Sequence, residues 1–198
     1  PKDGLVRLQA ADNNYYLIDQ AAMLLGLSRL AISLQDRDIA FAADLDAMRA
    51  TLWQAMERRV DDETGLWLST VPPDTEDDEP IPQEYEIIDL LVASLAADMS
   101  DRADDSWLGS YKYQHRIEKS VNWLNQQTDE TGLVGDKISL NGNQSEPSFF
   151  ATIALARMEM LVGNSDIAAK RFMIAEQVFR DAIYHLYRPY ALIDGVTQ

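Results

Sequence analysis

The stretch LIDQAAMLLGL at residues 17–27, followed by DIAFAADLDAMRATLWQAM at residues 38–56, decides the fold. Residues 15–34 contain only two charged side chains, and a helix that is apolar nearly all round is a buried helix. In residues 38–60, apolar side chains recur every three or four positions, which is the period of a helix with one apolar face. Those side chains are Phe41, Leu45, Met48, Leu52 and Met56. The two stretches therefore predict a buried helix paired with an amphipathic one.

The same alternation recurs twice further along the chain. Residues 87–99 (IIDLLVASLAADM) and 149–162 are mostly apolar, whereas residues 107–127 and 166–187 are amphipathic. No stretch alternates with the period of two that is typical of strands. The sequence predicts an all-α fold: three antiparallel helical hairpins, about six helices, in one bundle that forms a single domain over residues 1–198.

Short glycine turns follow the amphipathic segments. Asp62-Glu-Thr-Gly65 and Asp129-Glu-Thr-Gly132 are each followed by leucine, and Asp-Gly pairs with an apolar next residue also occur at Gly4 and Gly195. Glycine after a helix adopts the left-handed conformation without a Cβ clash, and the apolar residue then returns to the core. The pattern has two interpretations, either similar helix stops or a repeated hairpin.

Two loops of unusual composition separate the hairpins. Residues 70–83 (TVPPDTEDDEPIPQ) combine prolines with acidic side chains, which predicts an exposed, extended acidic loop. Residues 134–147 (VGDKISLNGNQSEP) are rich in asparagine and glycine and predict a second long loop. Both are long enough for a binding role, but plain surface loops are the favoured interpretation.

Composition excludes several classes of function. The 198 residues carry 33 acidic and 17 basic side chains, a net charge of −16, which argues against binding to nucleic acid or to an anionic membrane. There is no cysteine, so disulfides and thiolate chemistry are excluded. His115 and His185 lack the further ligands that a zinc site needs, and no phosphate-binding glycine motif occurs. We therefore expect neither a metal nor a cofactor, and no membrane association.

Several segments resemble the head-to-tail adaptor (tail tubular, or connector) proteins of short-tailed phages. The resemblance lies in residues 17–27, in residues 38–56 with Trp53 near their end, in IPQEYEIIDLLVASLAADM (81–99) and in AEQVFRDAIYHLYRPYALIDG (175–195). It implies a structural virion protein and not an enzyme. Such a protein forms a homo-oligomeric ring between the portal ring and the tail or nozzle proteins, in the neck of a virion assembled in the host cytoplasm.

In such a ring, DNA passes through the channel without specific binding, which an acidic lumen would favour. The resemblance also implies that the C-terminal tail, residues 189–198, docks on the portal. The partner-binding residues would then be Arg188, Tyr190, Leu192, Ile193 and Asp194. This adaptor function is the main expectation from the sequence.

The alternative rests on the hairpins and their D-x-T-G-L turns, which resemble the six-hairpin α/α toroid glycosidases. In those enzymes the loops that lead into the inner helices carry the active site, and here these loops contain Asp12, Trp67, Glu84 and Glu146. The resemblance implies an acid, a base and a sugar-stacking ring among these four residues. Three hairpins would supply half of such a toroid. A generic helical interaction module is the third possibility.

Overall fold

The computed structural model confirms the all-α fold with its six helices. It describes residues 15–61, 63–71, 84–104, 113–139 and 144–196, without the side chains of Val71 and of residues 185–196. The helices are α1 (Leu17–Leu34), α2 (Ile39–Glu57), α3 (Ile87–Ala103), α4 (Gln114–Gln127), α5 (Phe149–Leu161) and α6 (Ser165–Val196). Four short strands accompany them: β1 (Tyr15–Tyr16), β2 (Thr70–Val71), β3 (Glu84–Glu86) and β4 (Lys137–Ser139).

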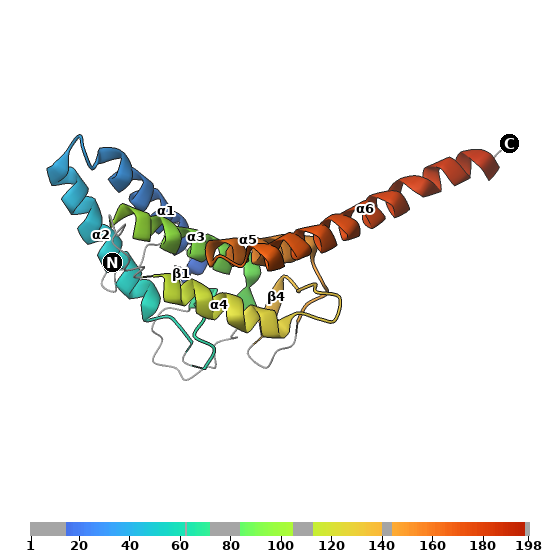
Figure 1. Cartoon of the computed structure of the whole chain (residues 1–198), viewed down its shortest axis with the longest axis horizontal. Coiled ribbons are helices and arrows are strands. Elements are labelled where there is room, and N and C mark those ends of the chain that lie inside the picture. Colours follow the sequence, from blue (N-terminus) through green and yellow to red (C-terminus); the bar gives the residue numbers. More distant parts are fainter. Residues whose placement is uncertain (1–14, 62, 72–83, 105–112, 140–143, 197–198) are drawn as a thin grey trace.

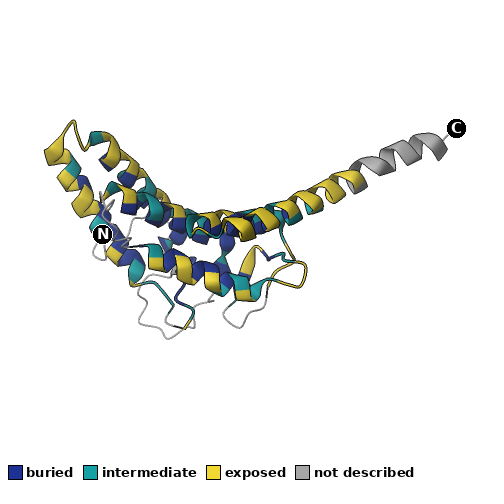
Figure 2. Ribbon diagram, viewed as in Figure 1, coloured by how far each residue is buried: buried dark blue, intermediate teal, exposed yellow. Residues whose placement is uncertain are grey.

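The helices form two layers (Figure 1). The apolar helices α1, α3 and α5 pack side by side and are called the inner helices below; α2 packs on α1, α4 on α3 and α5, and α6 on α5. The buried parts of the helices are concentrated where the helices meet (Figure 2). Leu24, Leu90 and Leu155 are fully buried members of one core cluster. Each such side chain stabilises the fold by about 1.5–3 kcal/mol through removal from water.

Helix α1 is long and apolar enough to cross a membrane by length and composition alone. In this fold it packs against both α2 and α3, and buried core helices pass the same test.

The apolar stripe predicted for α2 is only partly buried. Leu45, Leu52 and Met56 lie in the core, whereas Phe41 and Met48 are 45% and 55% exposed. Leu45 and Arg49, on either side of Met48, are buried, so exposed and buried residues alternate along the helix. A periodic stripe in the sequence therefore marks the face of a helix but not the turns of it that are covered.

The end of the chain differs from the prediction. Helix α6 continues through Pro189 to Val196, so the segment 189–198, expected as a non-helical tail, is helical as far as Val196. Proline removes one backbone hydrogen bond at its position, and here this does not end the helix. The C-terminal part of α6 projects away from the other helices (Figure 1).

Parts of both predicted loops are strands that close the helical hairpins. Strands β1 and β2 pair antiparallel, with Tyr16 opposite Thr70, and β3 and β4 pair antiparallel, with Glu86 opposite Lys137. Strands of two or three residues are too short to show an alternating pattern, so the sequence did not reveal them. Residues 72–83 and 140–143 of the two loops lie outside the described residues.

The first two hairpins repeat each other in detail, which supports the repeated-hairpin interpretation. The N–H of Leu17 donates to the carbonyl of Ser69 (2.9 Å), and the N–H of Ile87 donates to the carbonyl of Asp136 (3.0 Å). Ser69 lies four residues after Gly65, and Asp136 lies four residues after Gly132. In both hairpins, the chain after the glycine turn therefore pairs with the segment that precedes the inner helix of the same hairpin.

The two glycine turns share their conformation. Gly65 and Gly132 have φ angles of 71° and 82°, in the left-handed region that glycine adopts without strain. In the second turn Asp129 accepts hydrogen bonds from the backbone and hydroxyl of Thr131, as the motif suggests. In the first turn the equivalent acceptor is Asp61, which lies one residue before the start of the motif.

Candidate active site

Inner helices α1 and α3 begin with the same five-residue pattern. Tyr-Tyr-Leu-Ile-Asp ends at Asp19, and Tyr-Glu-Ile-Ile-Asp ends at Asp89. The acid is the third residue of each helix, where the unpaired backbone N–H groups favour negative charge. The repeat is visible in the sequence, and it marks Asp19 and Asp89 as candidate site residues that the toroid resemblance did not include.

Asp89 is a buried carboxyl among other charged groups. It is 7% exposed. Burial raises the pKa of Asp89 to about 6, and the negative charges of Glu86 and Asp19 add to the rise, against a hydrogen bond from Ser69 and the charge of Lys137. Asp89 therefore exchanges its proton close to neutral pH. We call Asp19, Glu86 and Asp89, with Ser69 and Lys137, the acidic edge.

Two polar residues of the acidic edge hold Glu86. The Nζ atom of Lys137 lies 2.9 Å from Oε1 of Glu86, and this hydrogen bond raises the pKa of Lys137. The backbone N–H of Glu86 donates to Oγ of Ser69 (2.7 Å). Ser69 belongs to the first hairpin, whereas Glu86 and Asp89 belong to the second, so the acidic edge spans the junction between them.

The acidic edge can carry out proton transfer. Asp89 is buried and titrates near pH 6, whereas Glu86 is partly exposed and paired with a lysine that stabilises its negative charge. A buried carboxyl group with a raised pKa next to a second carboxyl group is an arrangement that general acid–base catalysis uses.

Trp67 does not fit the expected role of a sugar-stacking ring. It is fully buried and packs edge-to-face on Trp53, with ring centroids 5.7 Å apart. Its indole N–H has no hydrogen-bond partner among the described residues. The loop position suggested exposure, but the residue after the glycine turn returns the chain to the core.

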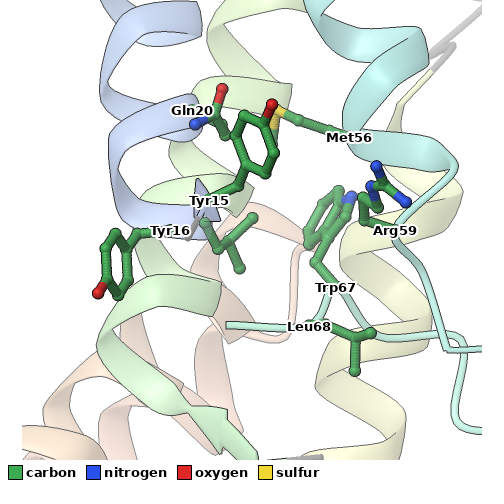
Figure 3. Close-up of a pocket in the computed structure, with 8 residues that line it drawn as sticks. Tyr15, Tyr16, Gln20, Met56, Arg59, Trp67 and Leu68 are labelled. Atoms are coloured by element: carbon green, nitrogen blue, oxygen red, sulfur yellow. The ribbon is translucent and has the colours of Figure 1, made fainter. Parts of the chain in front are cut away.

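Trp67 lines a small pocket at the start of α1 (Figure 3). Its empty volume is about 260 Å³, including open solvent at the mouth, and most of its lining is apolar. Tyr15 points toward Met56 and Trp67 lies beside Arg59, whereas Tyr16 points away to the other side (Figure 3). The pocket and the acidic edge are close in sequence, because Ser69 follows the lining residue Trp67 by two residues.

Glu84 and Glu146, two of the residues expected from the sequence, lie on opposite sides of strand β4. Strand β4 lies between them, since Tyr85 pairs with Ile138 on one side and Gln144 pairs with Ile138 on the other. This register separates their backbones by about 14 Å, from two strand spacings and three residues of strand.

The other predicted site residues are placed as follows. Glu84 is exposed, and its Oε2 lies 4.0 Å from Nζ of Lys137, at the margin of the acidic edge. Asp12 lies outside the described residues, and the same holds for the side chains of Arg188, Tyr190, Leu192, Ile193 and Asp194. Within the described part of the chain, no group of three His, Asp or Glu residues is arranged to hold a metal ion.

Solved structures with a similar fold include a crystal structure of D-mannose isomerase, with a TM-score of 0.59 and 16% sequence identity. The similarity covers 85% of this chain and 40% of the isomerase chain, so this chain spans less than half the length of that protein. The isomerase has a helical, toroid-like enzyme fold, which fits the resemblance to toroid enzymes. No protein-family model and no curated protein sequence matches the chain.

Proposed function

We propose that this chain forms part of a carbohydrate-active enzyme of the α/α toroid type, in which the acidic edge hydrolyses a glycosidic bond. The observation that carries the proposal is the buried Asp89 beside the lysine-paired Glu86, at the start of the central inner helix. The similarity in fold to a sugar isomerase supports a sugar as the substrate class.

Each carboxyl group has a distinct role in this proposal. Protonated Asp89 donates its proton to the glycosidic oxygen as the bond to the anomeric carbon breaks. Ionised Glu86 accepts a proton from the water that attacks that carbon. Lys137 pairs with the carboxylate of Glu86. Ser69 accepts a hydrogen bond from the backbone N–H of Glu86 and hydrogen-bonds to the side chain of Asp89.

The phage-adaptor function expected from the sequence stays a prediction. No contact among the described residues supports it over the enzyme, and the side chains expected to dock on a portal lie in the part of α6 whose side chains are not described. We therefore rank the carbohydrate-active enzyme first.

Substitution of the two acids tests the proposal. The wild type, Asp89→Asn and Glu86→Gln are incubated with gluco-, manno- and xylo-oligosaccharides, and new reducing ends are measured. Because general acid–base catalysis contributes about 10²- to 10⁴-fold, each variant should lose at least about a hundredfold in turnover. Asp98→Asn is the matched control, because Asp98 lies on the same helix but nearer its C-terminal end, where it pairs with Arg102.

Two results would contradict the proposal. One is wild-type protein that hydrolyses none of these sugars, and the other is an Asp89→Asn variant as active as Asp98→Asn. A parallel assay for the interconversion of mannose and fructose identifies the alternative reaction. If that activity is present and hydrolysis is absent, the assignment of hydrolysis is wrong.

A further inference from the structure

The small pocket at the start of α1 has a buried hydrogen-bond donor in its wall that lacks an acceptor. Trp67 is 0% exposed, and its indole N–H has no hydrogen-bond partner among the described residues. An indole nitrogen can only donate, and a buried donor without an acceptor lowers the stability of the fold. A bound group that accepts a hydrogen bond would satisfy this N–H.

The repeat between the first two hairpins shows that the fold does not require this donor. Trp67 lies two residues after Gly65, and Val134 lies two residues after Gly132, the equivalent turn glycine. Val134 is also 0% exposed. An apolar side chain without a donor therefore fills the same buried position in the second hairpin. The N–H of Trp67 is a feature of the pocket and not of the glycine turn.

A second polar side chain of the pocket departs from the repeat in the same way. Gln20, the fourth residue of α1, lines the pocket and is 3% exposed, whereas the fourth residue of α3 is the fully buried Leu90. Arg59 also lines the pocket, and among the described lining residues it is the only charged one. No acidic side chain lines it in a protein with 33 acidic residues. The lining therefore favours an anionic group.

The backbone brings Arg59 and Trp67 together. Val60 pairs with Trp67, and the N–H of Leu68 donates to the carbonyl of Arg59 (3.1 Å). Figure 3 shows the indole nitrogen of Trp67 at the edge of the ring nearest Arg59. Arg59 is half-buried, and its long side chain can shift to admit a ligand atom. Because guanidinium and indole nitrogens only donate, one acceptor between them can bind both.

We propose that this pocket binds a short-chain aliphatic carboxylate. Its carboxylate group accepts hydrogen bonds from the indole N–H of Trp67 and the guanidinium of Arg59. Its hydrocarbon chain lies against the apolar lining residues Leu17, Met56 and Leu68. The volume of about 260 Å³, with the open mouth included, favours a chain of few carbon atoms. This site is separate from the acidic edge, and the inference does not depend on the proposed function.

Nuclear magnetic resonance of the ¹⁵N-labelled full chain tests the site with butyrate as the probe. The chain has four tryptophans, and the indole N–H signal that is missing from Trp67→Phe belongs to Trp67. This signal should shift saturably when butyrate is added at constant ionic strength, and uncharged butyramide should not shift it. The backbone N–H signal of Leu68 then gives the dissociation constant of butyrate for each variant.

Trp67→Phe keeps an aromatic ring but removes the donor, and Arg59→Gln removes the charge. Each should weaken butyrate binding about tenfold, as expected for loss of one hydrogen bond to a charged group. Trp123→Phe is the matched control, because Trp123 packs on Tyr85 and does not line the pocket. Its affinity for butyrate should equal that of the wild type. Arg59→Gln keeps the test decisive if the core substitution Trp67→Phe does not fold.

Three results would overturn the inference. The first is a Trp67 signal that does not move with butyrate up to about 100 mM, far above the dissociation constant of a specific site. The second is equal binding of butyramide and butyrate, which would show that the carboxylate is not recognised. The third is an Arg59→Gln variant with wild-type affinity. None of these results bears on the loss of turnover expected for Asp89→Asn, so the proposed function is tested separately.

Discussion

Ionisation of the buried Asp89 lowers the free energy of unfolding of the protein at neutral pH. Its folded-state pKa of about 6 lies above the ordinary value of 3.8 because burial disfavours the carboxylate. A raised pKa in an acid means that the folded state binds the proton more tightly than the unfolded state does. The resulting stability is present below about pH 4 and is lost as the pH rises through about 6.

Asp89→Asn should therefore stabilise the protein at pH 7.5, by about 2 kcal/mol, since two pKa units correspond to about 2.7 kcal/mol. The gain should shrink as the pH falls from 7 to 4, because protonated Asp89 and asparagine are both uncharged. Urea unfolding of both proteins across this range measures the difference. A free energy of unfolding for Asp89→Asn that is lower than that of the wild type at pH 7.5 would contradict the assignment.

At the scale of residues, the composition of the sequence excludes whole classes of function, but local patterns identify individual site residues poorly. Trp67 is an aromatic residue in a loop, and nothing local shows that the turn buries it. Asp19 and Asp89 were accessible through the repeated Tyr-x-Leu/Ile-Ile-Asp pattern. The contact between Ser69 and Glu86 was not, because it joins two hairpins through backbone geometry that no local pattern encodes.

Two arginines link successive hairpins in the same way. Nη1 of Arg116 donates to the carbonyl of Gly65 (2.8 Å), and Nη1 of Arg171 donates to the carbonyl of Gly132 (2.8 Å). Each arginine also pairs with a glutamate, Arg116 with Glu57 (2.7 Å) and Arg171 with Glu159 (2.8 Å). The outer helix of one hairpin thereby holds the glycine turn of the preceding hairpin.

Removing these arginines should destabilise the fold to different degrees. Arg171→Met leaves Glu159 charged with a side chain that is 0% exposed, and breaking such a buried pair costs about 3–5 kcal/mol. Arg116→Met should cost less, because the Glu57 side chain is 26% exposed and water can solvate it. Chemical denaturation of the two variants tests this order.

A neutral partner should restore part of the loss. Replacing Glu159 by glutamine in the Arg171→Met background removes the unpaired buried charge, so the double variant should be more stable than Arg171→Met alone. A larger loss for Arg116→Met than for Arg171→Met, or no recovery in the double variant, would show that the links do not depend on burial of the glutamates.

At the scale of elements, helical periodicity predicts which helices are inner and which are outer. It does not predict how far each helix is covered or where α6 ends: Phe41 and Met48 of α2 are exposed, and α6 continues past the expected stop. The four short strands have no sequence pattern of their own. They form because the backbone before each of α1 and α3 pairs with the chain that returns from the glycine turn.

At the scale of the whole molecule, exposed apolar side chains are concentrated in the first and third hairpins. Among the described residues, all large exposed apolar side chains except Ile88 and Leu95 belong to the first and third hairpins. The middle hairpin packs between the other two hairpins, because α3 contacts α1 on one side and α5 on the other. This distribution agrees with a chain that resembles 40% of a larger toroid-type protein.

The whole-molecule arrangement could not be derived from the sequence alone. The charge of −16 fits an acidic channel and an acidic active site equally well, and only the fold brings Glu86 and Asp89 together with Ser69 of the preceding hairpin. The toroid resemblance came from the repeated turns, which the structure shows to be equivalent in register. The phage-adaptor resemblance came from residue types along single helices, which many helical proteins share.

A crystal structure of the protein soaked with the oligosaccharide that it binds most tightly tests the central claim most directly. We predict a sugar whose hydroxyl groups or glycosidic oxygen lie within hydrogen-bond distance of Glu86 or Asp89. A sugar bound elsewhere on the protein, with the acidic edge empty, would contradict the account.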